Sequence, residues 1–254
     1  MIYYFSATGN SLHVAKQLAA PNERLIPIPD AIDRQAYRFR IEPGESVGIV
    51  SPTYNWAMPS VVSEFLERMK LVYDAKPYLY YVGTFGTTTG AAATMANRIM
   101  RRKGIPFDAL FDVKMPDTWT PLFDLSDKKR VAGINLQADA EIARIKEAIG
   151  AKVAGKHMHV TTPYLTGVIG KRIYDGKTRR TSNLSVEQAC ISCGLCAKKM
   201  PRSRDRDAAQ APRLGKRPVR HVPRMPASLP HIRHPMRPQH QTPRTIPSSV
   251  SSKT

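Results

Sequence analysis

Short apolar segments alternate with amphipathic helical segments through the first 155 residues of the chain. Parallel strands need a long crossover connection, usually a helix, so this alternation predicts an α/β fold with a parallel sheet. We expect five β–α units that build a doubly wound, five-stranded sheet. The expected strands span residues 2–5, 24–28, 47–50, 78–82 and 111–115, and the expected helices span residues 11–18, 61–69, 91–102 and 136–153.

The composition changes after this domain, which we place at residues 1–155. Residues 156–185 are predicted to form a basic connecting arm, and residues 186–201 hold all three cysteines. Residues 202–254 contain no aromatic residue, Cys or Glu, but nine Pro, and twelve Lys or Arg against two Asp. Such a segment buries too little apolar surface to offset the entropy of ordering it, so we expect a disordered tail.

The net charge of +19 is unevenly distributed, because residues 202–254 contribute +10 of it. This charge raises the hypothesis of a basic nucleic-acid-binding module, but the tail has no aromatic side chain on which a base could stack. We therefore do not expect nucleic acid as a partner. No apolar run approaches the ~20 residues that span a bilayer, and no basic stretch precedes a hydrophobic segment at the N-terminus. These patterns predict a cytoplasmic protein without membrane contact.

A turn rich in hydroxyl and amide side chains follows the first expected strand and opens the first expected helix. Backbone N–H groups at a helix N-terminus favour an anion, hydroxyls add donors, and a glycine lets the backbone approach a phosphate closely. The turn contains no Lys or Arg and matches neither G-K-[ST] nor G-x-G-x-x-G, so it would hold a monophosphate by uncharged hydrogen bonds. A helix cap without a ligand is the alternative. The candidate phosphate-binding residues are Ser6, Thr8, Gly9, Asn10 and Ser11.

Two further loops leave the carboxyl ends of expected strands, where open α/β sheets bind their ligands. One loop carries two aromatic residues, and the other is rich in Gly and Thr. Flat apolar side chains suit stacking on a flavin ring, and backbone groups suit its polar edge. For Trp56, a buried anchor of the loop is the alternative. The candidate ring-binding residues are Thr53, Tyr54, Asn55, Trp56, Thr84, Phe85 and Gly86.

The turn F-S-A-T-G-N-S and the loops S-P-T-Y and G-T-F-G-T-T-T-G together resemble flavodoxins. More closely, residues 1–201 resemble bacterial proteins that fuse a flavodoxin domain to a ferredoxin with two 4Fe–4S clusters. The resemblance implies a flavodoxin-like fold with FMN as cofactor. It places the phosphate on the first turn, Tyr54 and Trp56 against the isoalloxazine, and residues 84–86 at the ring's edge. Residues 115–119 also recur in that family, and either border the flavin pocket or pack structurally.

The cysteines Cys190, Cys193 and Cys196 have the spacing of the bacterial ferredoxin run C-x2-C-x2-C-x3-C-P. In a reducing compartment this spacing favours a metal or cluster over disulfides. Met200 stands where the fourth Cys belongs, the expected Pro201 follows it, and no second cysteine run appears. The resemblance therefore implies a partial 4Fe–4S module with an incomplete ligand set, and we expect a weak or absent iron–sulfur cluster.

The sequence after Lys199 is explained by translation in a shifted frame. If the reading frame is shifted by one base from Met200 onward, so that each new codon begins at the second base of the old one, Met200-Pro201 must encode Cys. The reason is that ATG followed by any proline codon contains TGC. The same shift forces Cys at position 225, permits Cys at positions 219, 222 and 229, and permits Pro at position 230. These positions complete a second C-x2-C-x2-C-x3-C-P run. We therefore interpret residues 202–254 as out-of-frame sequence without selected function.

The intact design would exchange electrons between FMN and iron–sulfur clusters, since a flavin takes one or two electrons and a cluster takes one. The basic charge of residues 1–201 predicts acidic redox proteins as partners. The sequence contains neither an HExxH motif nor an evident Ser–His–Asp set, so we assign no catalytic residue. Two alternatives stay open: an FMN-dependent NAD(P)H or quinone reductase, and the nucleic-acid-binding module.

Overall fold

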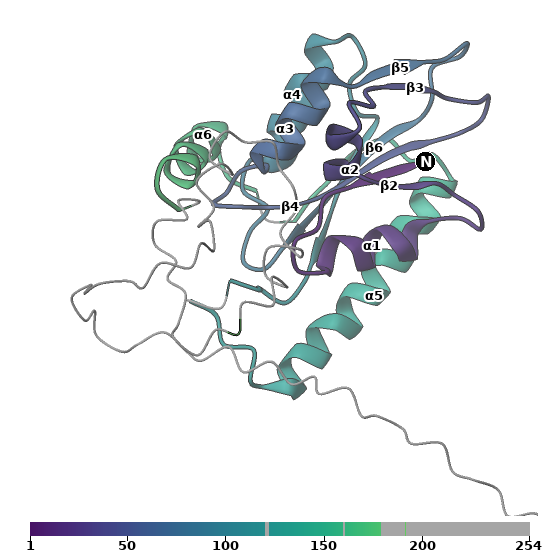
Figure 1. The fold of residues 1–254 in the computed structure, drawn as a ribbon. Coiled ribbons are helices and arrows are strands. Elements are labelled where there is room, and N and C mark those ends of the chain that lie inside the picture. The colour runs from purple at the N-terminus through teal and green to yellow at the C-terminus, as the bar shows by residue number, and fades with distance from the viewer. Residues whose placement is uncertain (120–121, 160, 179–190, 192–254) are drawn as a thin grey trace, which may run out of the picture. The chain divides into compact units, whose positions relative to one another are not determined.

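The computed structural model describes residues 1–119, 122–159, 161–178 and 191. Its central element is a six-stranded sheet with the order β2-β1-β4-β6-β7-β8, in which every neighbouring pair is parallel (Figure 1). The chain first moves outward from β1 to β2 and then crosses to the other side of β1, so the sheet is doubly wound as expected. The strands are β1 (Ile2–Tyr4), β2 (Leu25–Pro27), β4 (Val47–Pro52), β6 (Leu79–Phe85), β7 (Ala109–Lys114) and β8 (Gly155–His157).

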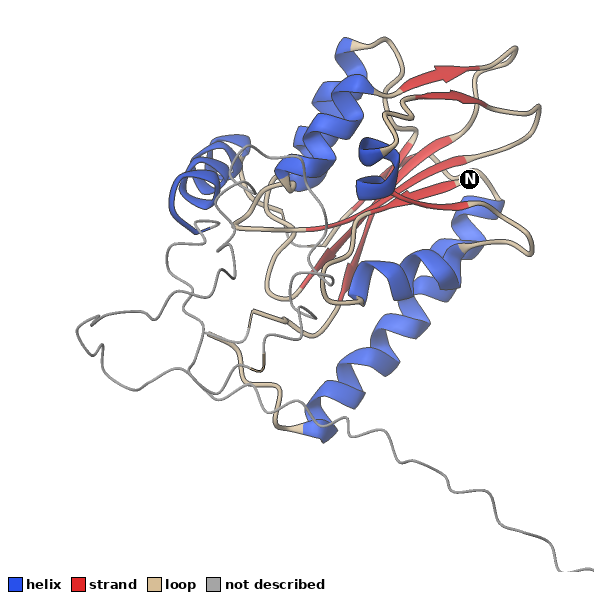
Figure 2. Cartoon of the chain, viewed as in Figure 1, coloured by secondary structure: helices blue, strands red, loops and turns tan. Residues whose placement is uncertain are grey.

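Helices cover both faces of this sheet (Figure 2). Side chains alternate between the two faces along a strand. Tyr80 packs with α1 and α5, whereas its neighbour Tyr81 packs with α3 and α4. Burial on both faces explains why the central strands are almost continuously apolar. One face carries α1 (Asn10–Leu18) and α5 (Lys128–Gly150), and the other carries α2 (Ile28–Asp33), α3 (Ser60–Arg68) and α4 (Ala92–Arg102).

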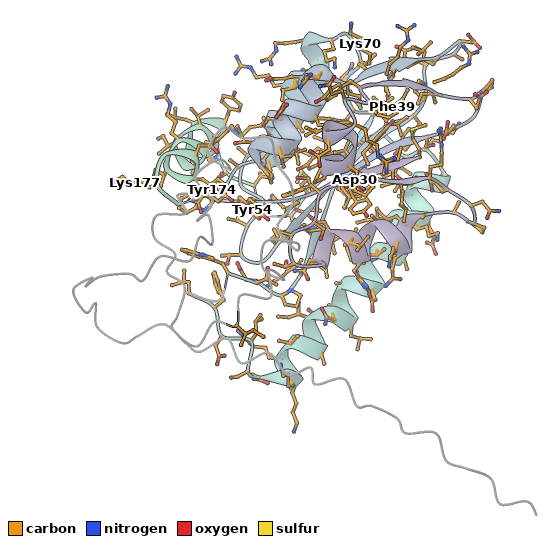
Figure 3. All side chains as sticks on the ribbon, in the orientation of Figure 1. Asp30, Phe39, Tyr54, Lys70, Tyr174 and Lys177 are labelled. Atoms are coloured by element: carbon orange, nitrogen blue, oxygen red, sulfur yellow. The ribbon has the colours of Figure 1, made fainter. Side chains whose placement is uncertain are left out.

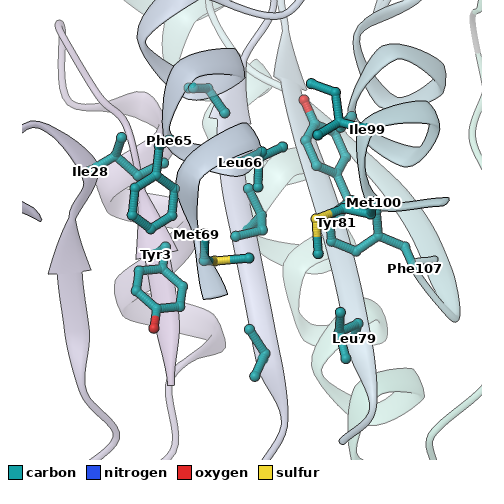
Figure 4. Packing of buried hydrophobic residues seen from close by; sticks show 14 of the residues in the cluster. Tyr3, Ile28, Phe65, Leu66, Met69, Leu79, Tyr81, Ile99, Met100 and Phe107 are labelled. Atoms are coloured by element: carbon teal, nitrogen blue, oxygen red, sulfur yellow. The ribbon is translucent and has the colours of Figure 1, made fainter. Parts of the chain in front are cut away.

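The larger core lies between the sheet and helices α2, α3 and α4 (Figure 4). Tyr3 and Phe65 are fully buried there, with ring centroids 5.1 Å apart. Tyr81 and Phe107 form a second ring contact at 5.8 Å. Burying an apolar side chain of this size stabilises a fold by roughly 1.5–3 kcal/mol. This core holds the strand ends in fixed positions relative to one another.

The structure corrects the expected number of strands from five to six. Strand β8 was not predicted, because its three residues are all exposed and carry no apolar pattern. A separate two-stranded parallel sheet, formed by β3 (Arg38–Arg40) and β5 (Lys70–Val72), was also not predicted. Helix α5 begins at Lys128 rather than at residue 136, since the Asp127 side chain caps it by accepting the N–H of Arg130.

The segment after β8 contains regular structure within the expected connecting arm. Helix α6 spans Tyr164–Ile173, and a π-helical turn, η1, spans Tyr174–Thr178. The predicted cysteine ligands and the predicted disordered tail lie outside the described residues, as does the region of the proposed frameshift. Among the helices of residues 1–119, 122–159 and 161–178, none is long and apolar enough to cross a membrane.

Candidate functional site

Four loops converge at the carboxyl edge of the sheet and enclose a cavity of about 650 Å³. They follow β1, β4, β6 and β7, and the chain reverses its direction of winding between β1 and β4, which is where such sheets place their ligand site. Eleven of the twelve residues proposed from the sequence line this cavity, and the twelfth, Gly9, does not. The eleven are Ser6, Thr8, Asn10, Ser11, Thr53, Tyr54, Asn55, Trp56, Thr84, Phe85 and Gly86.

The turn after β1 presents the N-terminus of α1 without a side-chain cap. Gly9 occupies the N-cap position with φ 104°, a left-handed conformation that a glycine adopts at little cost. Its carbonyl accepts the N–H of His13, and its own N–H donates to Oγ of Ser6. The first N–H groups of a helix have no acceptor within the helix. In α1 these groups belong to the end of the helix that borders the cavity, where Asn10 and Ser11 line it beside Thr8.

Hydroxyl and amide side chains tie this turn to the neighbouring loops. The Thr8 and Thr118 hydroxyl oxygens are 2.9 Å apart, and Nδ2 of Asn10 donates to the carbonyl of Pro116 at 2.9 Å. Oγ of Ser11 lies 2.8 Å from Oγ1 of Thr84, where both residues are buried. The contacts fix the turn after β1 against the ends of β6 and β7.

The loop after β4 contains a tight two-residue turn. Tyr54 and Ala57 exchange two backbone hydrogen bonds of 2.9 Å across it. The central residues Asn55 and Trp56 have φ values of 45° and 61°. A left-handed backbone is tolerable for asparagine but strained for tryptophan. Trp56 is 45% exposed and lines the cavity, so the structure does not support the alternative of a buried anchor.

The loop after β7 supplies a further wall. Residues 116–119 line the cavity, so the sequence alternative in which this segment borders the pocket is the one that the structure shows. Trp119 is 51% exposed. Leu122 and Phe123, from the same loop, were not predicted, because they follow no recognisable pattern in the sequence. Tyr174 of η1 was also not predicted, and it lies far along the chain from the other lining residues.

The cavity is almost uncharged. Among the described residues that line it, Asp117 is the single charged side chain. One of its oxygens accepts the N–H of Trp119 at 3.1 Å. Burial raises the pKa of Tyr54, and the neighbouring hydroxyl of Tyr174 raises it further. Tyr54 therefore stays neutral, and the site can hold a ligand through neutral donors and apolar surface.

Comparison with known proteins identifies the family. The family model described as "Flavodoxin domain" matches residues 1–141, and no curated protein sequence matches the chain significantly. The chain belongs to the flavodoxin domain family. The expected flavodoxin-like α/β fold is thus confirmed, whereas the fused ferredoxin and the frameshift are not tested. The described part of the flavodoxin-domain protein contains no group of three or more His, Cys, Asp or Glu that could hold a metal.

Three solved structures illustrate the likeness. Rubredoxin oxygen:oxidoreductase from Desulfovibrio gigas is 18% identical with a TM-score of 0.36, and the match covers 61% of this chain but 36% of that one. The flavodoxin of Streptococcus pneumoniae TIGR4 is 16% identical with a TM-score of 0.36, over 60% of this chain and 97% of that one. A Fusobacterium nucleatum flavodoxin bound to flavin mononucleotide is 10% identical with a TM-score of 0.34, over 57% and 95%.

Proposed function

We propose that the protein binds FMN in the cavity at the carboxyl edge of the sheet and serves as an electron-transfer flavoprotein. The observation that carries the proposal is the convergence of four separate loops on one cavity of about 650 Å³, with an uncapped helix N-terminus at one end. This volume lies within the range of about 300–1,000 Å³ that is usual for cofactor sites. Membership of the flavodoxin domain family agrees with this cofactor.

The donor set at the phosphate end fits a monophosphate. Unpaired N–H groups of the first turn of α1 and the macrodipole of the helix both favour an anion there. The hydroxyl of Thr8 and the amide of Asn10 add neutral donors, and Ser11 lines the same end with its hydroxyl paired to that of Thr84. In this proposal the phosphate replaces the contact of Thr8 with Thr118 and that of Asn10 with the carbonyl of Pro116. Thr118 and Pro116 can rearrange because both lie in the loop after β7.

The other end of the cavity fits a flat aromatic ring. Trp56 and Trp119 present half-exposed indoles, and Phe85 and Tyr54 contribute largely buried ring surface. Offset stacking of such rings is favourable beyond the area that it buries. In the proposal these residues orient the isoalloxazine and exclude water from it, while the backbone of residues 84–86 meets its polar edge. Bound FMN would supply reversible one- and two-electron transfer.

A titration of the purified full-length protein with FMN tests this function. We expect the protein to retain flavin absorbance bands through gel filtration, and to quench the fluorescence of added FMN with a saturable, one-to-one stoichiometry. A protein that stays colourless and leaves the fluorescence of added FMN unchanged would exclude the proposal. Steady-state oxidation of NADH by the FMN-loaded protein would favour the reductase alternative over a carrier.

Electron exchange with an iron–sulfur module is the second part of the proposal. It is supported by the spacing of Cys190, Cys193 and Cys196, which lie outside the described residues. A cluster is held by four ligands, so these three thiolates do not complete a set. We therefore propose that this chain's cluster site is impaired, and that its flavin exchanges electrons with separate, acidic redox proteins attracted by the net positive charge of residues 1–201.

A further inference from the structure

The segment after β8 lies beyond the residues that match the flavodoxin domain, yet it reaches the cavity. Tyr174, the first residue of η1, lines the cavity, and its ring centroid is 5.3 Å from that of Tyr54 (Figure 3). We propose that Tyr174 of η1 forms an outer wall of the cofactor site and contacts the flavin ring, and that α6 holds it in place. This inference rests on the proposed FMN function.

Two glycines bring α6 into direct contact with the loop after β4. A Cβ added at Gly170 would overlap the carbonyl of Asn55, and one added at Gly167 would overlap Ala91 and crowd the carbonyl of Trp56. The helix therefore approaches the backbone of the strained Asn55–Trp56 turn more closely than any larger residue would allow. Its glycines thus pack directly on the backbone of this turn.

The exposure of the large apolar side chains of α6 agrees with a helix positioned by close backbone approach rather than by hydrophobic burial. Leu165, Ile169 and Ile173 recur every four residues and are 66%, 52% and 46% exposed. The side of the helix that faces the domain instead carries its two buried residues, both glycines. A helix held chiefly by hydrophobic burial would place the large residues inward.

Polar contacts anchor the end of α6 to the start of α3. Nζ of Lys171 lies 2.5 Å from Oγ of Ser60 and 3.4 Å from a carboxylate oxygen of Asp175. The Ser60 hydroxyl also lies 2.7 and 2.8 Å from the two oxygens of Asp175. Since Ser60 is the first residue of α3, these contacts fix α6 at the far end of the loop that contains Trp56.

The beginning of the segment is anchored as well. Thr161 pairs with Gly90 in an isolated parallel bridge, and the N–H of Thr162 donates to the carbonyl of Gly90 at 3.0 Å. The guanidinium of Arg98 lies 4.9 Å from the ring centroid of Tyr164. With both ends fixed to α3 and α4, the segment holds the half-buried Tyr174 ring at the cavity in a defined position, ready to contact a bound ring.

The test compares FMN dissociation constants of full-length variants, with circular dichroism to verify folding. We expect Tyr174→Leu, which keeps apolar contact with Tyr54 but removes the aromatic ring, to weaken binding by about tenfold. Tyr174→Phe should stay within about twofold of wild type because it retains the ring. Leu165→Ala, an exposed change on α6 outside the cavity, should also leave binding unchanged.

Gly170→Val provides an independent arm, because the added side chain would push α6 away from Asn55 while Tyr174 stays intact. It should weaken FMN binding by about tenfold as well. If wild type binds FMN and both Tyr174→Leu and Gly170→Val bind it equally well, the inference is wrong and the proposed function stands. If wild type itself does not bind FMN, both the proposed function and this inference are wrong.

Discussion

Nδ1 of His159 lies 2.6 Å from Oδ1 of Asp112, and the backbone N–H of the same histidine donates to Oδ2 at 2.9 Å. The Asp112 side chain, on β7, is fully buried, whereas the imidazole is 64% exposed. The carboxylate thus fixes the chain just after β8 to the neighbouring strand. The hydrogen bond to Asp112 and its charge raise the pKa of His159, with smaller effects from burial, Glu141 and Arg144.

This pair predicts a pH-dependent stability. Because the folded pKa of His159 exceeds the unfolded value of about 6.5, the ion pair contributes fully below that pH, and its contribution is lost as pH rises through the folded pKa. The exposed imidazole limits the contribution to less than about 1 kcal/mol. Urea unfolding should show His159→Gln less stable than wild type at about pH 5.5 and nearly equal at about pH 8.5. A difference that does not vary with pH would contradict the prediction.

The Asn55–Trp56 turn predicts opposite effects on stability and binding. Trp56→Gly should leave the free energy of unfolding unchanged or raise it by up to about 1 kcal/mol, because glycine relieves the left-handed strain. It should weaken FMN binding by about tenfold, because the indole is lost. Trp56→Ala is the matched variant: it loses the same ring but keeps the strain, so it should bind equally weakly and be less stable than Trp56→Gly. Undiminished FMN affinity in both variants would remove Trp56 from the site.

The uncharged phosphate turn predicts sensitivity to a single added charge. Thr8→Asp places a carboxylate where the phosphate is proposed to lie, and should weaken FMN binding by at least about thirtyfold. Thr8→Asn has nearly the same shape and loses the same contact to the Thr118 hydroxyl, so it isolates the charge. Riboflavin, which lacks the phosphate, should not distinguish the two variants. Equal FMN affinities of Thr8→Asp and Thr8→Asn would place the phosphate elsewhere.

Lys103, the residue that follows α4, caps the C-terminal end of α3. Its Nζ lies 2.7 Å from the carbonyl of Leu66 and also contacts the carbonyl of Met69, so the cation meets the negative end of α3. Lys103→Met should lower the free energy of unfolding by about 1–2 kcal/mol. Arg102→Met removes a cation from an exposed pair with Glu67 and should cost less than about 0.5 kcal/mol. Chemical denaturation of both variants checks the difference, and equal losses would contradict the capping role.

The incomplete cysteine run predicts substoichiometric iron. After anaerobic reconstitution, iron counting and EPR should show less than one 4Fe–4S cluster per chain. The fourth ligand of the cluster held by Cys190, Cys193 and Cys196 would come from a second cysteine run, and no such run appears in this sequence. A stable, stoichiometric 4Fe–4S signal would refute this. The coding DNA tests the frameshift directly: the neighbouring frame after the Lys199 codon must contain the second cysteine run, and its absence would disprove the interpretation.

The central strands and the phosphate turn were predictable because their signals are local. The apolar runs that became β1, β4, β6 and β7 are short and bounded by turn residues. The turn from Ser6 to Ser11 combines a strand end, a glycine and a helix start within a few positions. Parallel connectivity then requires all carboxyl ends to lie at one edge, so the loops carrying Trp56 and Phe85 could be assigned to one site before their distances were known.

Elements without an apolar pattern could not be predicted in this way. Strand β8 is fully exposed, and the burial of α6 rests on two glycines, which a search for hydrophobic periodicity cannot detect. The large apolar residues of α6 are exposed, so hydrophobic periodicity would suggest the wrong face of this helix as the buried one.

The sequence by itself determined the α/β class, the turn at α1 and the neutral chemistry of the proposed phosphate site, because these depend on residues adjacent in the chain. Only the tertiary structure decided that Tyr174 reaches Tyr54, that Trp119 borders the same cavity, and that His159 pairs with Asp112. Each of these contacts joins segments separated by many residues. Such contacts form only when the whole sheet is assembled and the helices have packed on both of its faces, since chain entropy opposes every one of them in isolation.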